Sequence, residues 1–179
     1  MAQLRAAADG EEPGIGAFVD AYWPRMHRIA ALITAGGPEA EDIAQESVLR
    51  ALAALPELDL ERAIEPWLDR VTANASRDWL RKQARRQEVL LDQVADEEED
   101  PGWPAVLDAG QLAEEVVHAL AELSAEERTV VVLRHALDFR GTEIAELLGV
   151  PDGTVRSLNH RALKKLRKQL KPEEVADAR

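Results

Sequence analysis

Apolar residues in the first part of the chain recur at the spacing of one face of an α-helix. The first such stripe, with steps of three or four residues, consists of Phe18, Tyr22, Met26, Ile29 and Ile33. Gly36 and Gly37 end this predicted helix, and Pro38 suits the first turn of the next one. That next helix opens with acidic residues, which complement the positive end of its dipole. Its predicted buried positions are Ile43, Ala44, Val48, Ala51 and Leu55.

A third helix is predicted to begin at Pro66, after a loop over residues 56–65. Its inward stripe consists of Leu68, Val71, Ala75 and Trp79. On the other side of this helix, one stripe at helical spacing holds Arg70, Asn74, Arg77, Arg81 and Arg85. A charge run by itself is typical of a solvated helix face, so the basic stripe is assigned a function only together with the wider pattern of the chain.

The second part of the chain shows the pattern of a helix-turn-helix motif. Its first predicted helix carries the apolar stripe Leu112, Val116, Ala119, Leu120 and Leu123. Ser124 with Glu127 predicts a capping box for the following helix. Thr142 is predicted to cap a short helix, and Gly149 occupies the turn, where a positive φ costs glycine least.

The last predicted helix has one apolar and one polar side. The inward residues are Val155, Leu158, Ala162, Leu166 and Leu170. The first turns expose Thr154, Arg156, Ser157 and His160. In helix-turn-helix proteins, side chains at such positions face the base edges and phosphates of duplex DNA. A plain helical hairpin without this function is the alternative interpretation.

Charge is distributed unevenly along the 179 residues, whose formal net charge is −12. Residues 92–110 contain seven acidic and no basic residues, together with two Pro and two Gly, and have no helical period. They predict a flexible acidic linker, so the fold class is all-α with two small helical domains. The predicted organisation is a disordered N-terminus over 1–13, domains over 14–91 and 111–171, the linker over 92–110 and a polar tail over 172–179.

Several classes of function find no support in the sequence. The chain has no Cys, which excludes disulfides, thiol nucleophiles and thiolate metal sites. Its four His are scattered singly, and no phosphate-binding loop, nucleophile elbow or dinucleotide fingerprint is present. We therefore expect no enzyme, no cofactor and no metal. The N-terminus has no apolar segment and no uncharged run reaches the length of a membrane span, so we expect a cytoplasmic protein without a membrane partner.

Four motifs in the same order make the chain resemble the extracytoplasmic-function (ECF) sigma factors, a group of the bacterial sigma-70 family, from about Ile15 to Leu170. The motifs are residues 22–26 (YWPRM), residues 40–46 (AEDIAQE) with Arg50, the helix with Trp67-Leu68, Arg70-Val71 and Asn74, and residues 153–157 (GTVRS) with His160-Arg161-Ala162. The resemblance implies a sigma factor that binds core RNA polymerase and directs promoter-specific initiation. It also allows an anti-sigma factor as a further partner.

The resemblance implies separate roles for the two domains. The first is similar to sigma region 2, whose acidic second helix docks on the clamp helices of the β′ subunit, here through Glu41, Asp42, Gln45, Glu46 and Arg50. Its third helix and the preceding loop would melt and hold the minus-10 element through Arg70, Asn74, Arg77 and Arg81. The second domain is similar to region 4, which binds the β flap and reads the minus-35 element, here through Thr154, Arg156, Ser157, His160, Arg161, Lys164 and Lys165. The acidic linker would imitate the transcript in the polymerase cleft, with autoinhibition of DNA binding as the alternative.

The chain departs from the family at a few positions. Family members usually carry an aromatic residue at the position of Asp69, so we expect an altered DNA-facing surface there. They usually have Arg and then an apolar residue where Leu158 and Asn159 stand. Because Leu158 fits the inward period of its helix, the expected cost is one phosphate contact.

Two other classes of function remain open. One is a stand-alone helix-turn-helix regulator that binds operators as a dimer, and the other is a protein–protein adaptor, which the net negative charge favours. A dimeric regulator would protect a palindrome by itself. A sigma factor would protect a bipartite site only together with polymerase.

Overall fold

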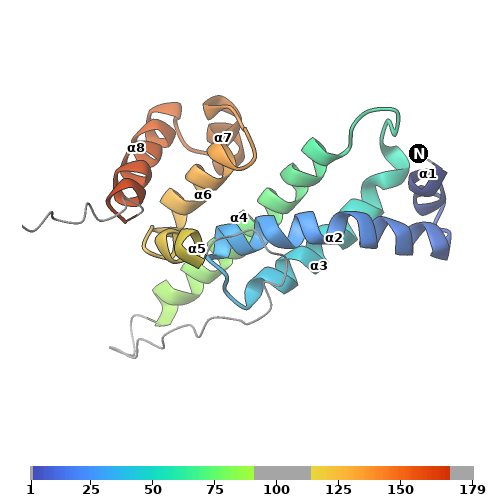
Figure 1. The fold of residues 1–179 in the computed structure, drawn as a ribbon, viewed down its shortest axis with the longest axis horizontal. Helices are drawn as coiled ribbons and strands as arrows, with labels where there is room; N and C mark the ends of the chain where they lie inside the picture. The colour runs from blue at the N-terminus through green and yellow to red at the C-terminus, as the bar shows by residue number, and fades with distance from the viewer. Residues whose placement is uncertain (1, 91–113, 170–179) are drawn as a thin grey trace, which may run out of the picture. The chain divides into compact units, whose positions relative to one another are not determined.

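A computed structural model describes residues 2–90 and 114–169, and every regular element within these residues is a helix. The chain divides into two compact units, residues 1–104 and 105–179 (Figure 1). The predicted all-α fold class is confirmed. The acidic linker 92–110 and the polar tail 172–179 lie outside the described residues, so their boundaries stay predictions.

The N-terminal unit is a bundle of packed helices. Its elements are α1 (Ala2–Ala8), α2 (Glu12–Thr34), α3 (Glu39–Ala54), a short 3-10 helix η1 (Leu55–Glu57) and α4 (Glu65–Leu90). Helices α2, α3 and α4 pack against one another, and α1 packs on α2 (Figure 1). Their core includes Phe18, Met26, Val48, Leu55 and Leu68. Full burial of an apolar side chain of this size stabilises a fold by roughly 1.5 to 3 kcal/mol.

Helix α1 lies in the segment 1–13 that was expected to be disordered, so that expectation is wrong for residues 2–8. Ala7 is buried against the core, and a Cβ at Gly14 would overlap the backbone of Ala6 and Ala7. The missing side chain of Gly14 therefore lets α1 fold back closely onto α2. The alanine-rich sequence of α1 favours a helix by propensity, which a search for apolar periodicity does not detect.

A buried ion pair joins α2 to α4. Asp69 is buried, and its two carboxylate oxygens accept hydrogen bonds from Nε and Nη2 of Arg25 at 2.7 and 2.8 Å. This bidentate arrangement is the strong form of an Arg–carboxylate contact. The hydrogen bond to Asp69 raises the pKa of the Arg25 guanidinium. Asp69 therefore faces the interior, and the expectation that it alters a DNA-facing surface is wrong.

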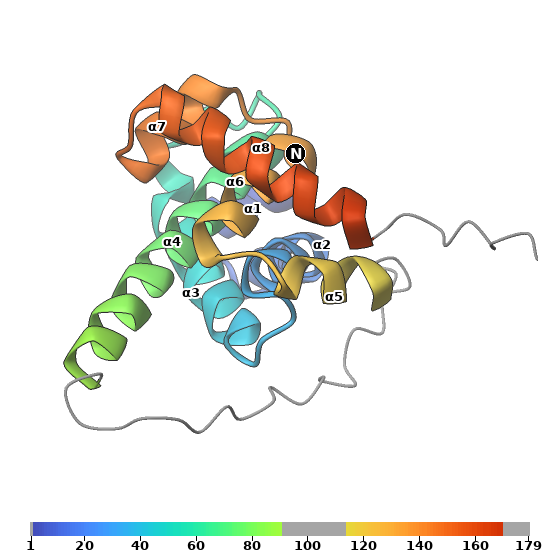
Figure 2. The same cartoon turned by 90° about the vertical axis from the view of Figure 1, so that its left-hand side faces the viewer.

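The C-terminal unit contains the predicted helix-turn-helix. Its elements are α5 (Glu114–Ala121), α6 (Ala125–His135), α7 (Gly141–Leu148) and α8 (Asp152–Gln169). Helices α6, α7 and α8 pack together around Leu133, Ile144, Val155 and Ala162 (Figure 2). Gly149 ends α7 with a φ of 68°, as the turn requires.

The predicted cap of α6 is confirmed. The hydroxyl of Ser124 accepts from the backbone N–H of Glu127, and the N–H of Ser124 donates to the Glu127 carboxylate, both at 3.2 Å. The guanidinium of Arg128 donates to the carbonyls of Leu120 and Leu123 at 2.8 and 3.0 Å. It thereby satisfies carbonyls around the end of α5, where a cation also complements the helix dipole.

The predicted cap of α7 is wrong. The helix begins at Gly141, so Thr142 already lies inside its first turn, and Arg140 holds the cap position. The backbone N–H of Arg140 donates to the Glu143 carboxylate at 2.9 Å. Within residues 2–90 and 114–169, no helix is both long and apolar enough to cross a membrane.

Candidate functional site

The predicted cationic stripe lies on the outward side of α4. Its described members, two exposed and two half-buried, are Arg70, Arg81, Asn74 and Arg77. The side chain of Arg85 is outside the described residues.

The inward side of α4 is rotated slightly from the prediction. Leu68 and Ala75 are buried as predicted, but Val71 and Trp79 are only half-buried. Thr72 and Ser76 lie inside instead, and their hydroxyls donate to the carbonyls of Leu68 and Thr72 at 3.0 and 2.9 Å. These bonds satisfy the buried hydroxyls within the helix, so small polar residues can complete its inward face.

The loop before α4 is anchored on the core. Leu58 and Leu60 pack against the core cluster, and Ile64 is buried. Between them, Asp59 and Arg62 are exposed and form an ion pair in which Arg62 Nε lies 3.2 Å from Asp59 Oδ2. The loop therefore presents polar side chains outward from a fixed base. A pocket for an extruded base between this loop and the stripe stays a prediction.

Helix α3 presents an acidic outer face. Its exposed residues include Glu41, Asp42, Gln45 and Glu46, while all five positions predicted to be buried are buried. Leu49 belongs to this face with 64% of its surface exposed, more than any other large apolar residue in the described parts of the chain. Sequence reasoning missed Leu49, although its step of seven residues from Asp42 places both on one side of the helix. An exposed apolar side chain with acidic neighbours is typical of the centre of a protein interface.

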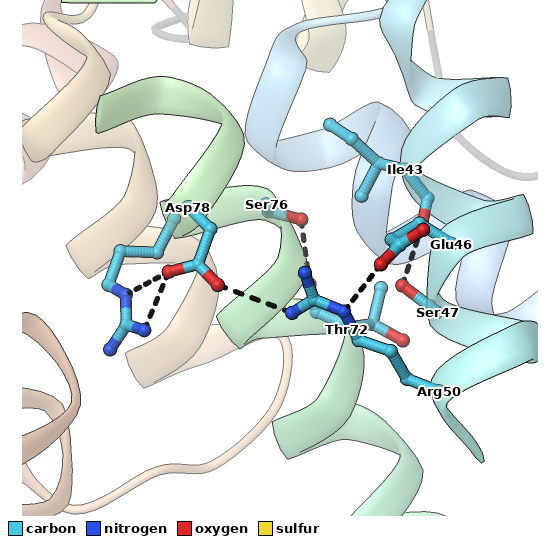
Figure 3. A network of polar contacts seen from close by, with 8 residues as sticks. Ile43, Glu46, Ser47, Arg50, Thr72, Ser76 and Asp78 are labelled. Carbon is cyan, nitrogen blue, oxygen red and sulfur yellow. Dashed lines mark hydrogen bonds and ion pairs between the residues drawn. The ribbon is translucent and has the colours of Figure 1, made fainter. Parts of the chain in front are cut away.

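Arg50 connects the α3 face to α4 (Figure 3). Its Nε lies 2.8 Å from Glu46 Oε1 on the same helix, and its Nη1 lies 3.2 Å from Asp78 Oδ2 on α4. The other oxygen of Asp78, Oδ1, lies 2.7 Å from Nη2 of Arg77. Burial raises the pKa of Asp78, but hydrogen bonds from Arg77 and Arg50 outweigh burial and hold it below its usual value. The predicted polymerase-facing Arg50 is thus in ionic contact, through Asp78, with the predicted DNA-facing Arg77.

Helix α8 displays the first turns of the predicted recognition surface (Figure 2). Its exposed side chains there include Thr154, Arg156, Ser157 and His160. Arg156 has 78% of its side chain exposed and pairs with Asp152 one turn earlier, with 2.8 Å between Nη2 and Oδ2. The hydroxyl of Ser157 donates to the carbonyl of Gly153 at 2.9 Å. An exposed ion pair of this kind contributes at most about 1 kcal/mol, so a stronger DNA contact can replace it.

A buried carboxylate holds the other edge of α8 against α6. Glu127 is buried, and its Oε2 lies 2.7 Å from Nζ of Lys165, while its Oε1 lies 3.7 Å from Nε of Arg161. The hydrogen bond from Lys165 lowers the pKa of Glu127. Two of the predicted DNA contacts, Arg161 and Lys165, are therefore paired inside the protein. Lys164 is exposed and lines an open surface hollow with His160 and Arg167.

A second tie between α6 and α8 involves a residue at which the chain departs from its family. Nε2 of His135 lies 3.0 Å from Oδ1 of Asn159, and Leu158 beside it is buried as its period predicted. The polar residue at position 159 therefore contacts α6. Among the described residues, no group of three or more His, Asp or Glu side chains is arranged to hold a metal ion.

Comparison with protein families matches both units. The family model described as Sigma-70 region 2 matches residues 18–86, and the model described as Sigma-70, region 4 matches residues 113–166. The chain is 30% identical over 180 residues to the ECF RNA polymerase sigma factor SigW of Bacillus subtilis (strain 168), covering 94% of this chain and 95% of SigW. It is 33% identical over 169 residues to the ECF RNA polymerase sigma factor SigL of Mycobacterium tuberculosis (strain H37Rv), covering 93% of this chain and 94% of SigL.

Solved structures share the fold. One is the sigma factor RpoE of Bartonella quintana in complex with the anti-sigma factor NepR, with a TM-score of 0.59, 21% identity, and coverage of 88% of this chain and 97% of that one. Another is CnrH in complex with the cytosolic domain of CnrY, with a TM-score of 0.52, 24% identity and coverage of 93% of both chains.

Proposed function

The chain belongs to the extracytoplasmic-function group of the sigma-70 family, and from that premise we propose how its two units share the task of starting transcription. It is a sigma factor that binds core RNA polymerase and directs promoter-specific initiation. The proposal concerns which surface does what. Covalent chemistry belongs to the polymerase, so the chain needs no catalytic residue of its own, and its place with the polymerase is the cytoplasm.

The outward stripe of α4 carries the proposal. Arg70, Asn74, Arg77 and Arg81 face away from the buried side of their own helix, so they can contact a nucleic-acid strand while the bundle stays intact. A row of guanidinium groups tracks the phosphates of a single strand, and the adjoining loop offers side chains to displaced bases. We assign this surface to opening and holding the minus-10 element.

The outer face of α3 is assigned to core polymerase. Glu41, Asp42, Gln45 and Glu46 offer carboxylates and an amide, and Leu49 supplies an apolar centre. Such a face fits a partner with an apolar contact point inside a basic rim. Since the Bartonella quintana sigma factor was solved with an anti-sigma factor, we extend to this chain the expectation that an anti-sigma factor is a second class of partner.

Helix α8 is assigned to the minus-35 element as duplex. Arg156 is long enough for a bidentate contact with a guanine edge, and Thr154, Ser157 and His160 flank it on the exposed side. Arg161, Lys164 and Lys165 were predicted with them as DNA contacts. The ion pairs of Arg161 and Lys165 with Glu127 favour Lys164 as the phosphate contact of the three.

Run-off transcription with core RNA polymerase and a pool of randomised promoter fragments tests the proposed function. We expect transcripts only when the chain is added, from templates that share two separated sequence elements. A footprint on a palindrome without polymerase would support the dimeric regulator instead. Binding to core enzyme without any promoter-specific transcript would support the adaptor.

The α3 assignment has its own test. Asp42→Lys combined with Glu46→Lys should weaken core binding, because both charges of the face are reversed, while helicity by circular dichroism stays unchanged. Leu49→Ala should weaken core binding without changing any charge. Unchanged affinity of both variants for core enzyme would remove α3 from the interface.

A further inference from the structure

Four charged side chains of alternating sign form a continuous chain of contacts from α3 to α4 (Figure 3). The order is Glu46, Arg50, Asp78 and Arg77, with separations of 2.8, 3.2 and 2.7 Å between successive charged atoms. One end, Glu46, lies on the face assigned to polymerase. The other end, Arg77, lies on the stripe assigned to DNA.

The packing of α3 on α4 does not depend on this chain of charges. The buried hydroxyls near it bond within their own helices: Ser47 donates to the carbonyl of Ile43 at 2.6 Å, and Thr72 and Ser76 donate to carbonyls of α4. The charged side chains lie outside this buried layer, with 42% of Arg50 and 44% of Asp78 exposed. Ion pairs exposed to this degree contribute little to stability and can be exchanged for other partners.

Asp78 divides its carboxylate between two cations. Oδ2 faces Arg50, whereas Oδ1 accepts from both Nε and Nη2 of Arg77 at 3.2 and 2.7 Å. A carboxylate this close to Arg77 weakens the attraction of that guanidinium for a phosphate. Whatever draws Asp78 toward Arg50 therefore strengthens the DNA-facing end of the chain of charges.

We propose that Asp78 couples polymerase docking on α3 to strand capture on α4. In the free chain, Asp78 partly neutralises Arg77. When a basic partner surface takes up Glu46, the charge of Arg50 is left to Asp78, and Arg77 turns to phosphate. By linkage, DNA on the stripe favours polymerase docking by the same factor. The coupling rests on the proposed assignment of both surfaces.

Binding of the free full-length chain to a short fluorescent single-stranded oligonucleotide gives the first test. Asp78→Asn should raise its affinity roughly two- to fivefold, the range of one exposed ion pair. Asp78→Glu, which keeps the charge, should return the affinity toward that of the unmodified chain. Asp20→Asn removes one charge from an exposed position on α2 and controls for net charge. A structural role alone would lower the affinity or leave it unchanged, so an increase specific to Asp78 supports the coupling.

A double-mutant cycle tests the order of the contacts. Glu46→Gln imitates occupation of Glu46 by a partner, so it should raise the affinity for the oligonucleotide about twofold. In the Asp78→Asn background the same change should have no effect, because the connection to Arg77 is gone. Equal effects of Glu46→Gln in both backgrounds would overturn the coupling.

Core polymerase provides the decisive comparison. The ratio of core affinities with and without the oligonucleotide should be larger for the unmodified chain than for Asp78→Asn by the same two- to fivefold. Arg81→Ala shows whether the stripe binds DNA at all. If Arg81→Ala weakens oligonucleotide binding and Asp78→Asn leaves the ratio unchanged, the coupling is wrong and the stripe assignment stands. If neither variant has any effect, the stripe assignment and the coupling are both wrong.

Discussion

Each compact unit places a carboxylate beside the cations of its outward helix, but the two carboxylates are held differently. Asp78 in the N-terminal unit has 44% of its side chain exposed, whereas Glu127 in the C-terminal unit has 5%. Asp78 bridges two arginines at the surface. Glu127 caps α6 and binds Lys165 of α8 beneath the surface.

This difference indicates what the neighbouring cations do. A buried carboxylate needs its partners, because removing them leaves a charge without water around it. Lys165, and more weakly Arg161, therefore hold α8 in place. A carboxylate exposed like Asp78 can exchange one cation for another at small cost, so Arg77 remains exchangeable. Cations of one type on two similar helices thus have different roles.

The largest expected effect concerns Arg156, which no buried carboxylate holds. Arg156→Ala should remove sequence preference at one base pair of the minus-35 element, because a bidentate Arg–guanine contact is worth roughly 1 to 3 kcal/mol of discrimination. Binding of the polymerase complex to a panel of single-base minus-35 variants measures this. A panel profile identical to that of the unmodified chain would show that α8 reads bases through other residues.

The next effect concerns the buried carboxylate. Glu127→Gln should destabilise the packing of α8 on α6 by about 1 to 2 kcal/mol, because it removes a charged hydrogen bond to Lys165. Hydrogen exchange of α6 and α8 amides in the full-length chain reports the loss. Asp78→Asn should change exchange in α3 and α4 by less than about 0.5 kcal/mol. Similar losses in both units would remove the contrast between the two carboxylates.

The same contrast predicts a pH dependence. The hydrogen bond from Lys165 lowers the pKa of Glu127, so the folded state favours the charged carboxylate over the unfolded state. Its stabilisation is complete above the ordinary Glu pKa of 4.5 and is lost as pH falls through the lowered value. Protection of α8 amides should therefore decline with acid more steeply in the unmodified chain than in Glu127→Gln. Parallel curves would contradict this role of Glu127.

The smallest effect separates two neighbouring lysines. Lys164→Ala should reduce the slope of log affinity for duplex DNA against log salt by about 0.9, the value for one phosphate contact. Lys165→Ala should leave the slope unchanged and instead reduce protection of α8 from hydrogen exchange. Equal reductions of the slope would mean that Lys165 leaves Glu127 for phosphate.

Most of the helical framework could be predicted because its signals are local. The capping box at Ser124 and the turn at Gly149 follow from short-range backbone chemistry. The stripe of α4 follows from helical period alone, and its outward position is observed at Arg70 and Arg81. Period also placed every predicted buried residue of α3 correctly.

Features that depend on contacts between distant residues could not be predicted. Asp69 is buried because Arg25, far away in sequence, binds both of its oxygens. Lys165 belongs to the basic run of α8 by sequence, but its position opposite Glu127 makes it an internal partner. Helix α1 was missed because its packing depends on the close approach permitted by Gly14, which leaves no apolar period.

The division of labour between α4 and α8 is the central claim, and permanganate footprinting of the polymerase complex on a selected promoter tests it directly. Arg77→Ala combined with Arg81→Ala should abolish or strongly reduce the reactivity of unpaired thymines in the minus-10 element. Binding of the same complex to a minus-35 duplex probe should stay within about twofold, since one lost exposed contact elsewhere has little effect at an independent site. Equal losses of strand opening and duplex binding would contradict the division and reduce the stripe to a nonspecific phosphate contact.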